Sequence, residues 1–276
     1  MRIARFVHPG GAAFGVVEGG PAQGGADVSL DALTVAEIEG HPFGQITFTG
    51  QRWALPDVRL LSPILPSKVV GVGRNYAAHA AELGHEVPSA PLLFLKPSTS
   101  VIGPADAIRL PVESHQVEHE AELAVVIGAT GARDVPKERA LDAVLGYSCA
   151  NDVTARDLQK ADVQFTRAKG YDSFGPLGPW IETNLDPSDL GVRCTVDGEL
   201  RQDGRTKDFI FDIATVISYI SHIMTLLPGD VILTGTPSGV GPITPGQRVE
   251  VSVEGLGTLT NTVSGADTVS TAGGAR

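Results

Sequence analysis

Three glutamates at alternating positions, Glu118, Glu120 and Glu122, run directly into the apolar stretch 123–128. In a strand, side chains two residues apart point to the same face, so these carboxylates form one row. Like charges in a row repel one another, and a hard cation such as Mg²⁺ removes that repulsion by binding carboxylate oxygens. The alternative interpretation is an edge strand with a solvated acidic face.

A further acidic residue follows a second apolar stretch. Asp152 comes at the end of residues 143–151, where it could complete a carboxylate cluster with Glu120 and Glu122. Arg156, four residues later, carries a planar fork of N–H groups suited to a substrate carboxylate. The alternative is a capping aspartate that forms a salt bridge with the arginine.

His79 and Glu82 lie three residues apart in the alanine-rich segment 74–84, which has high helix propensity and ends in glycine. On a helix the two side chains share a face and can touch. A carboxylate beside imidazole fixes its tautomer and raises its basicity, which suits a general base acting on water. The alternative is an ordinary surface pair.

Lys169 stands in a glycine- and proline-flanked segment, residues 167–176, which indicates a tight loop that could direct the lysine into a site. The alternative is a solvated lysine, the usual environment of this residue type.

Residues 235–241 form a second glycine-rich segment, Gly-Thr-Pro-Ser-Gly-Val-Gly. It lacks the Gly-Lys-Ser/Thr ending of a phosphate-binding loop and does not open a helix, which argues against a nucleotide site. Its backbone N–H groups, with Thr234 or Thr236, could still bind a carboxylate oxygen.

Composition narrows the classes of function. The net charge of −11 and the absence of a basic run disfavour nucleic acid as a partner. There is no apolar stretch of membrane-spanning length and no signal-peptide pattern at the first residues, so we expect no membrane association. Only two cysteines occur, Cys149 and Cys194, which fits buried free thiols and a cytoplasmic location.

The elements that must position these residues are mostly strands. Thirty-three glycines and nineteen prolines indicate many turns, hence a strand-rich fold. We predict a small β-rich domain at residues 1–66, a main domain at 67–264 and a disordered tail at 265–276. Apolar residues at three- and four-residue steps predict one long helix over residues 212–227.

Taken together, these motifs resemble the fumarylacetoacetate hydrolase family, specifically its compact bacterial acylpyruvase-like and 2-hydroxyhepta-2,4-diene-1,7-dioate isomerase-like members. The resemblance rests on the order and spacing of six segments, which are residues 73–82, 94–97, 120–128, 146–159, 168–170 and 226–241. It implies a mixed β-rich α+β fold in which a β-sandwich roll forms the catalytic domain, and it implies a homodimer.

The resemblance also implies the roles of individual residues. Glu120, Glu122 and Asp152 would hold Mg²⁺ or Mn²⁺, and a lid over residues 75 to about 90 would carry the His79–Glu82 dyad. The substrate pocket would be lined by Lys169, Arg156, Gln159, Gly235 and Thr236. Glu118 is a departure, because relatives often have aspartate two positions before the first ligand. A register of Glu118 and Glu120 is therefore open, but the apolar strand directly after Glu122 favours Glu120 and Glu122.

The expected chemistry is cleavage of a small 2-oxo acid. A divalent cation polarises the keto group and stabilises a pyruvate enolate while the bond beyond C3 breaks. The preferred prediction is hydrolysis of an acylpyruvate or fumarylpyruvate-type C–C bond, because both His79 and Glu82 are present to activate water. Oxaloacetate decarboxylation and isomerisation of 2-hydroxyhepta-2,4-diene-1,7-dioate share the same type of intermediate and remain alternatives. A non-catalytic carboxylate-binding protein is the alternative from another class.

Overall fold

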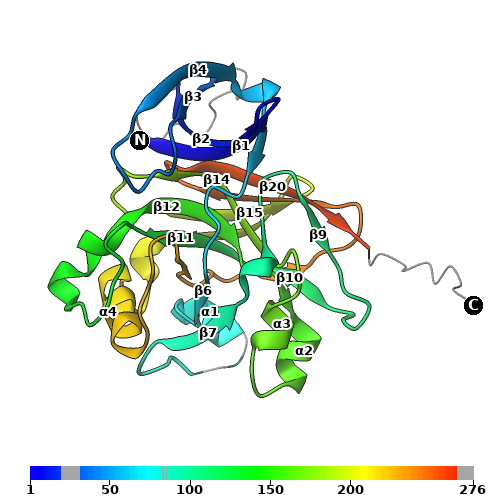
Figure 1. Ribbon diagram of the computed structural model, residues 1–276. Helices are drawn as coiled ribbons and strands as arrows, with labels where there is room; N and C mark the ends of the chain where they lie inside the picture. Colours follow the sequence, from blue (N-terminus) through cyan, green and yellow to red (C-terminus); the bar gives the residue numbers. More distant parts are fainter. Residues whose placement is uncertain (20–31, 83, 85, 266–276) are drawn as a thin grey trace, which may run out of the picture.

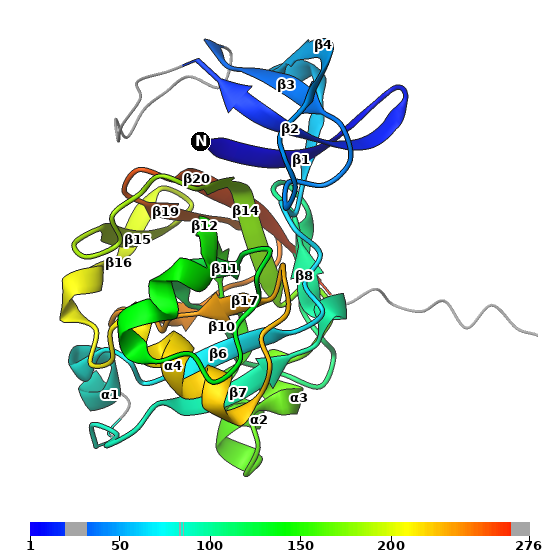
Figure 2. The ribbon, with the colours of Figure 1, turned by 60° about the vertical axis from the view of Figure 1, so that its left-hand side comes forward.

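The computed structural model describes residues 1–19, 32–82, 84 and 86–265, and most of its strands belong to one large sheet (Figures 1 and 2). The order along this sheet is β4-β3-β2-β1-β14-β12-β11-β17-β6-β7, with β5 beside β1 and β8 beside β14. The strands are β1 (Arg2–His8), β2 (Gly11–Glu18), β3 (Thr34–Ile38), β4 (Phe48–Ala54), β5 (Arg59–Leu61), β6 (Val69–Gly73), β7 (Leu92–Lys96), β8 (Val101–Ile102), β11 (Ala121–Ile127), β12 (Val144–Asn151), β14 (Gly175–Glu182) and β17 (Val231–Leu233). The predicted tail, Gly265 apart, lies outside the described residues.

Two smaller sheets complete the strand arrangement. One has the order β13-β10-β18, and the other has the order β16-β15-β19-β20-β9. Their strands are β9 (Ala107–Arg109), β10 (Val117–His119), β13 (Thr154–Ala155), β15 (Gly191–Val196), β16 (Glu199–Arg205), β18 (Gly241–Pro242), β19 (Arg248–Val253) and β20 (Gly257–Ser264). Most pairs are antiparallel, but β17–β6, β14–β8 and β20–β9 are parallel. The predicted mixed β-rich fold is confirmed.

The main core lies between the large sheet and the five-stranded sheet. Alternate residues of β15 and β19, such as Val192, Cys194 and Val251, are buried in it together with Leu123 and Cys149 from the large sheet. Such alternation puts one face of each strand into a shared apolar layer, which makes a β-sandwich. Both cysteines are buried and free, as the sequence predicts.

In the described part of the chain four short α-helices accompany the sheets: α1 (Ala77–Glu82), α2 (Arg156–Ala161), α3 (Thr166–Lys169) and α4 (Ile213–Ile223). The α4 helix begins after Asp212, whose carboxylate accepts a hydrogen bond from the Thr215 N–H at 2.7 Å and so caps the helix. The predicted extension to residue 227 is wrong. Met224 is already extended, and Leu226 exchanges backbone hydrogen bonds with Ala132 instead of continuing the helix.

The N-terminal strands extend the large sheet and do not form a sheet of their own. β1 and β2 form an antiparallel hairpin, and β1 also pairs with β14 through Arg2 and Ile3. Trp180 of β14 packs among the buried apolar side chains of this region, which include Phe6. Figure 2 shows these strands above the rest of the molecule. Among the described residues, no helix is long and apolar enough to cross a membrane.

Candidate metal centre and active site

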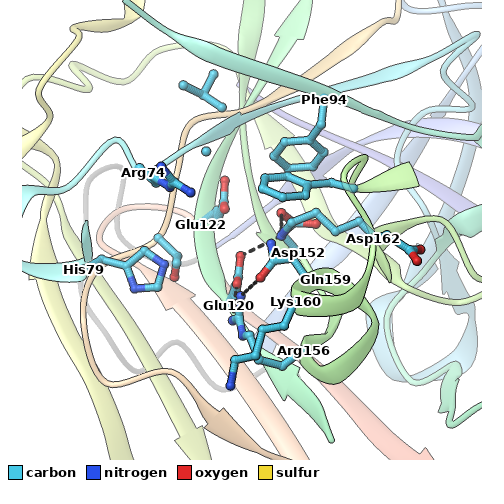
Figure 3. Close-up of a pocket in the computed structure, with 15 residues that line it drawn as sticks. Arg74, His79, Phe94, Glu120, Glu122, Asp152, Arg156, Gln159, Lys160 and Asp162 are labelled. Atoms are coloured by element: carbon cyan, nitrogen blue, oxygen red, sulfur yellow. Dashed lines mark hydrogen bonds and ion pairs between the residues drawn. The ribbon is translucent and has the colours of Figure 1, made fainter. Parts of the chain in front are cut away.

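Glu120, Glu122 and Asp152 form a compact carboxylate group where β11 begins and β12 ends, in neighbouring strands of the large sheet. Each offers an oxygen, and these oxygens all lie within 4.8 Å of one another. The three side chains are at most 4% exposed. Figure 3 shows them facing one cavity. This burial contradicts the solvated edge-strand interpretation, because β11 lies between β12 and β17.

Strand pairing brings these residues together. Ala121 of β11 lies opposite Asn151 of β12, so the residues just beyond this pair, Glu120 and Asp152, are neighbours. The Asp152 N–H donates to the Glu120 carbonyl at 2.9 Å, which closes the junction. Glu118 stays outside the group, since its carboxylate accepts hydrogen bonds from Arg156 at 2.7 Å and from the Gln116 amide at 2.6 Å.

Two buried lysines lie against the carboxylates. Lys169 is 3% exposed, and its Nζ donates to Glu120 at 3.0 Å, to Asp152 at 2.6 Å and to Thr154 at 2.7 Å. Lys96 is fully buried, and its Nζ lies 2.6 Å from the other Asp152 oxygen. Both oxygens of Asp152 therefore have a cationic donor. The solvated-lysine interpretation of Lys169 is wrong.

The carboxylates are not electrostatically equivalent. Burial would raise the pKa of Glu120, but the charges of Lys169 and Arg156 outweigh it and hold that pKa well below its usual value. The pKa of Glu122 is raised well above its usual value, first by burial and then by the charges of Asp152 and Glu120. The charge of Lys169 and the hydrogen bond from the Gly235 N–H, at 2.6 Å, oppose this shift without cancelling it. Unlike Glu120 and Asp152, Glu122 has no hydrogen bond from a lysine or arginine of the described chain.

A divalent cation fits this group of residues. The donors are hard carboxylate oxygens close enough to share one ion, which is the ligand set that Mg²⁺ and Mn²⁺ prefer. A cation there would also remove the repulsion that raises the pKa of Glu122. Glu120, Glu122 and Asp152 are the residues that would hold it.

His79 and Glu82 form a contact on α1 at the edge of the same cavity. The His79 Nδ1 lies 3.1 Å from one Glu82 oxygen, and the other oxygen accepts the Gly239 N–H at 2.9 Å. His79 is only 4% exposed and lines the cavity. Glu82 thus orients the imidazole and also ties α1 to the segment that follows β17.

Arg156 and Gln159 lie on α2 and contact each other. The guanidinium of Arg156 donates to Glu118, to Glu120 and to the Gln159 side-chain oxygen, so each of its three nitrogens has a protein partner. The sequence suggested a fork for a substrate carboxylate. In the structure this fork holds two carboxylates of the protein itself, although Arg156 and Gln159 both line the cavity.

Gly235 and Thr236 fix the segment after β17 to β11. The Gly235 N–H donates to Glu122, and the Thr236 hydroxyl donates to the Ala121 carbonyl at 2.8 Å. Gln202 donates to the Thr236 hydroxyl at 2.7 Å, and its oxygen accepts the Ala121 N–H at 3.0 Å. Thr236 also lines the cavity, while the Gly235 N–H is occupied by a protein carboxylate.

The cavity has a volume of about 370 Å³, and Figure 3 shows the side chains that line it. Its walls come from β6 and α1, from β7, from the carboxylate group and from α2 and α3. The lining residues are Val72, Gly73, Arg74, His79, Phe94, Glu120, Glu122, Asp152, Arg156, Gln159, Lys160, Asp162, Phe165, Lys169 and Thr236. Of the ten site residues named from the sequence, only Glu82 and Gly235 do not line it, and each bonds a residue that does.

Some residues at this site were not assigned from the sequence. Lys96 follows the apolar run of β7 and precedes proline, and a lysine directly after four apolar residues was a usable signal for a buried charge. Gln202 gives no local signal, because its partners lie more than 30 residues away in the chain. Arg74 begins the segment 74–84 that was predicted to favour a helix, whereas α1 begins only at Ala77, and only the structure shows that Arg74 lines the cavity.

Family models match nearly the whole chain. Residues 68–264 match the model described as fumarylacetoacetate (FAA) hydrolase C-terminal, and residues 1–63 match one described as Rv2993c-like, N-terminal. Protein Rv2993c of Mycobacterium tuberculosis is 53% identical over 95% of this chain and 98% of its own length. A mitochondrial oxaloacetate tautomerase of Oryza sativa is 51% identical over 69% of this chain and 88% of its own. The mitochondrial oxaloacetate decarboxylase of Dictyostelium discoideum is 47% identical, over 69% and 90% respectively.

Solved structures with the same fold carry different activities in their names. The 2-hydroxyhepta-2,4-diene-1,7-dioate isomerase from Mycobacterium marinum is 49% identical with a TM-score of 0.88, and the match covers 97% of this chain and 100% of that one. Fumarylpyruvate hydrolase from Pseudomonas aeruginosa, in complex with Mn²⁺ and pyruvate, is 33% identical with a TM-score of 0.68. That match covers 74% of this chain and 91% of that one.

Proposed function

This chain belongs to the fumarylacetoacetate hydrolase family, and on that premise we propose that it hydrolyses a C–C bond of a small acylpyruvate-type 2-oxo acid. Mg²⁺ or Mn²⁺ is the cofactor, held by Glu120, Glu122 and Asp152. The observation that carries the proposal is that one cavity joins the carboxylate group to a buried histidine whose tautomer is fixed by Glu82.

Glu120, Glu122 and Asp152 would hold the cation in the part of the cavity that takes the 2-oxo acid end of the substrate. When bound, a divalent cation would supply Lewis-acid chemistry. It would polarise the keto oxygen and stabilise the negative charge that develops there as the bond between C3 and the distal carbon breaks. Lys169 adds a fixed positive charge beside Glu120 and Asp152. Its three N–H donors are taken by protein oxygens, so it contributes charge and not a direct proton.

His79 activates the water in this proposal. An ionised Glu82 can only accept hydrogen bonds, so the His79 Nδ1 carries the proton and Nε2 has a free lone pair. Nε2 takes a proton from water while the hydroxide oxygen attacks the distal carbonyl carbon. The bond from that carbon to C3 then breaks and its electrons form the pyruvate enolate. Transfer of the proton held by Nε2 to C3 gives pyruvate and a carboxylic acid, and leaves His79 neutral again.

A proton shift is the second candidate function. The oxaloacetate tautomerase and the heptadienedioate isomerase are 51% and 49% identical to this chain, compared with 33% for the fumarylpyruvate hydrolase. In such a reaction the same His79 Nε2 would move a proton at C3, with no water consumed. Decarboxylation of oxaloacetate, the activity named for the Dictyostelium relative, would need no base.

The test compares turnover of acetylpyruvate, fumarylpyruvate and oxaloacetate by cation-stripped protein to which Mn²⁺ has been restored. We expect pyruvate to be released fastest from an acylpyruvate, and EDTA to abolish that release. Faster release of CO₂ from oxaloacetate would make the protein a decarboxylase, and ketonisation of enol-oxaloacetate alone would make it a tautomerase. Tight binding without turnover of any of them would indicate a carboxylate-binding protein.

Three further features stay predictions. The chain divides near residues 66 and 67, which agrees with the gap between the two matched models. It forms a homodimer and acts in the cytoplasm.

A further inference from the structure

Arg74 occupies a backbone conformation that arginine rarely adopts. Its φ is 59°, in the left-handed region, at the turn that joins β6 to α1. For a residue with a Cβ this conformation is strained, so the surroundings must impose it. The neighbouring Asn75 does so, because its buried amide donates to the Phe211 and Thr234 carbonyls and accepts the Phe211 N–H at 2.8 Å.

The side chain of this rigid turn lines the cavity. Figure 3 shows the Arg74 guanidinium pointing toward the cavity beside Glu122, on the same side as His79. Within the described part of the chain, Arg74 has neither an ion pair nor a side-chain hydrogen bond, although it is half-buried. Arg156, Lys169 and Lys96, by contrast, have carboxylate partners.

The charges around the cavity leave room for a second anion. Four acidic and four basic side chains line it, so their formal charges cancel. The acids are Glu120, Glu122, Asp152 and Asp162, and the bases are Arg74, Arg156, Lys160 and Lys169. A divalent cation adds two positive charges. The carboxylate of a 2-oxo acid head group neutralises only one of them, and a buried excess charge is unfavourable.

We propose that Arg74 determines specificity by binding a second carboxylate, at the end of the substrate opposite its 2-oxo acid group. This inference rests on the proposed function and narrows its substrate class to 2-oxo dicarboxylic acids. The planar guanidinium can bind a carboxylate through two parallel N–H donors, and a rigid turn keeps it in place. Arg74 enters from the side of His79, which places the second carboxylate near the base that acts on the distal carbon.

Lys160 is the competing residue. Its ammonium also has no ion partner among the described residues, and it lines the cavity from α2. It differs from Arg74 because its side chain is exposed and its backbone is ordinary helix. An exposed lysine keeps most of its hydration and gains little from an added anion.

Calorimetry on the Mn²⁺-loaded protein tests the assignment with acids matched in length. One pair is 2-oxoglutarate and 2-oxopentanoate, and the other is 2-oxoadipate and 2-oxohexanoate. We expect the wild-type protein to bind the dicarboxylate of at least one pair about 10- to 100-fold more tightly. Arg74→Met should remove this preference while affinity for the monocarboxylate stays within about twofold. Arg74→Lys should keep part of it, and Lys160→Met should keep it all.

The outcomes separate the two proposals. If no 2-oxo acid binds, the proposed function itself fails. If the wild-type protein binds both members of each pair equally, only the role of Arg74 is overturned. The same holds if Lys160→Met removes the preference and Arg74→Met does not. Thermal unfolding and Mn²⁺ affinity show whether each variant is folded. If Arg74→Met does not fold, a reduced preference for the dicarboxylate in Arg74→Lys supports the role of Arg74, and an unchanged preference overturns it.

Discussion

The cavity and the N-terminal strands of this protein bury opposite kinds of side chain. Around the cavity, Lys96, Lys169 and Asp152 are almost wholly inaccessible and bound to one another. In the N-terminal strands the buried residues are apolar, as in the cluster around Phe6, and the ion pair of Arg52 with Glu18 has partly exposed side chains. Both regions belong to one continuous sheet, which makes the difference informative.

The contrast concerns what each region is selected to do. Burying apolar groups stabilises a fold directly, whereas burying paired charges costs desolvation that their attraction repays only in part. A fold does not need a network such as that of Glu120, Lys169 and Asp152 for stability. A site that binds a cation and an anionic substrate does need it, because those ligands complete the charge balance.

Removing a carboxylate from the cavity should have the largest effect. We expect Glu120→Gln to lower turnover by about 10⁴-fold, or 5–6 kcal/mol, because a cation ligand and the partner of Lys169 and Arg156 are both lost. Steady-state kinetics at saturating Mn²⁺ measures this. Glu37→Gln in β3 is the control, since it removes one carboxylate from the other region and should leave turnover unchanged. Unaltered Mn²⁺ affinity in Glu120→Gln would contradict the assignment.

Truncating the N-terminal core should show the reverse pattern. Phe6 is fully buried, so Phe6→Ala should lower the free energy of unfolding by about 4 kcal/mol. Urea unfolding measures this loss. Mn²⁺ affinity below the unfolding transition should stay within about twofold of the wild type. A tenfold loss of affinity would mean that the junction of β1 with β14 controls the site.

Removing the base should affect one reaction and spare another. We expect His79→Ala to lower acylpyruvate hydrolysis by at least about 10²-fold, or about 3 kcal/mol, the contribution typical of a general base. Any oxaloacetate decarboxylation should persist, because that step needs no water. Glu82→Gln is the matched variant, and it should also lower the rate of acylpyruvate hydrolysis, by a smaller factor than His79→Ala. Intact hydrolysis in His79→Ala would disprove water activation.

Low pH should weaken Mn²⁺ binding at the cavity. Because burial and the charges of Asp152 and Glu120 raise the pKa of Glu122, this group holds a proton to a higher pH than a free glutamate does. Mn²⁺ affinity should therefore fall below that pKa, by up to about tenfold per pH unit, or 1.4 kcal/mol. Calorimetry between pH 5.5 and 8 in buffers of different ionisation enthalpy would detect the released proton. Affinity independent of pH would be the contrary result.

In the cation-free protein the raised pKa of Glu122 means that low pH stabilises the folded state, although low pH weakens Mn²⁺ binding. A carboxyl group whose pKa is raised on folding stabilises the folded protein when it is protonated. Its contribution to the free energy of unfolding is therefore complete below the pKa of a free glutamate, about 4.3. That contribution is lost as the pH rises through the raised pKa. Added Mn²⁺ should restore stability most strongly at the upper end of this range.

Local features of the chain were sufficient to predict much of the fold. Apolar spacing predicted α4 as far as residue 223, and the order of six segments identified the family. The first signal depends on residues within a few positions of each other, and the second depends on motifs that are each read locally. The predicted site residues also come together around one cavity, although their roles stay predictions.

Only the tertiary structure decided which charges are partners. Glu118, Glu120 and Glu122 have the same residue type and spacing, yet Arg156 separates the first of them from the cation site. Lys96 meets Asp152 across 56 residues of sequence, and a turn that Asn75 holds leaves Arg74 without an ion partner among the described residues. Periodicity carries no information about such contacts, because they are set by which strands pair and in which register.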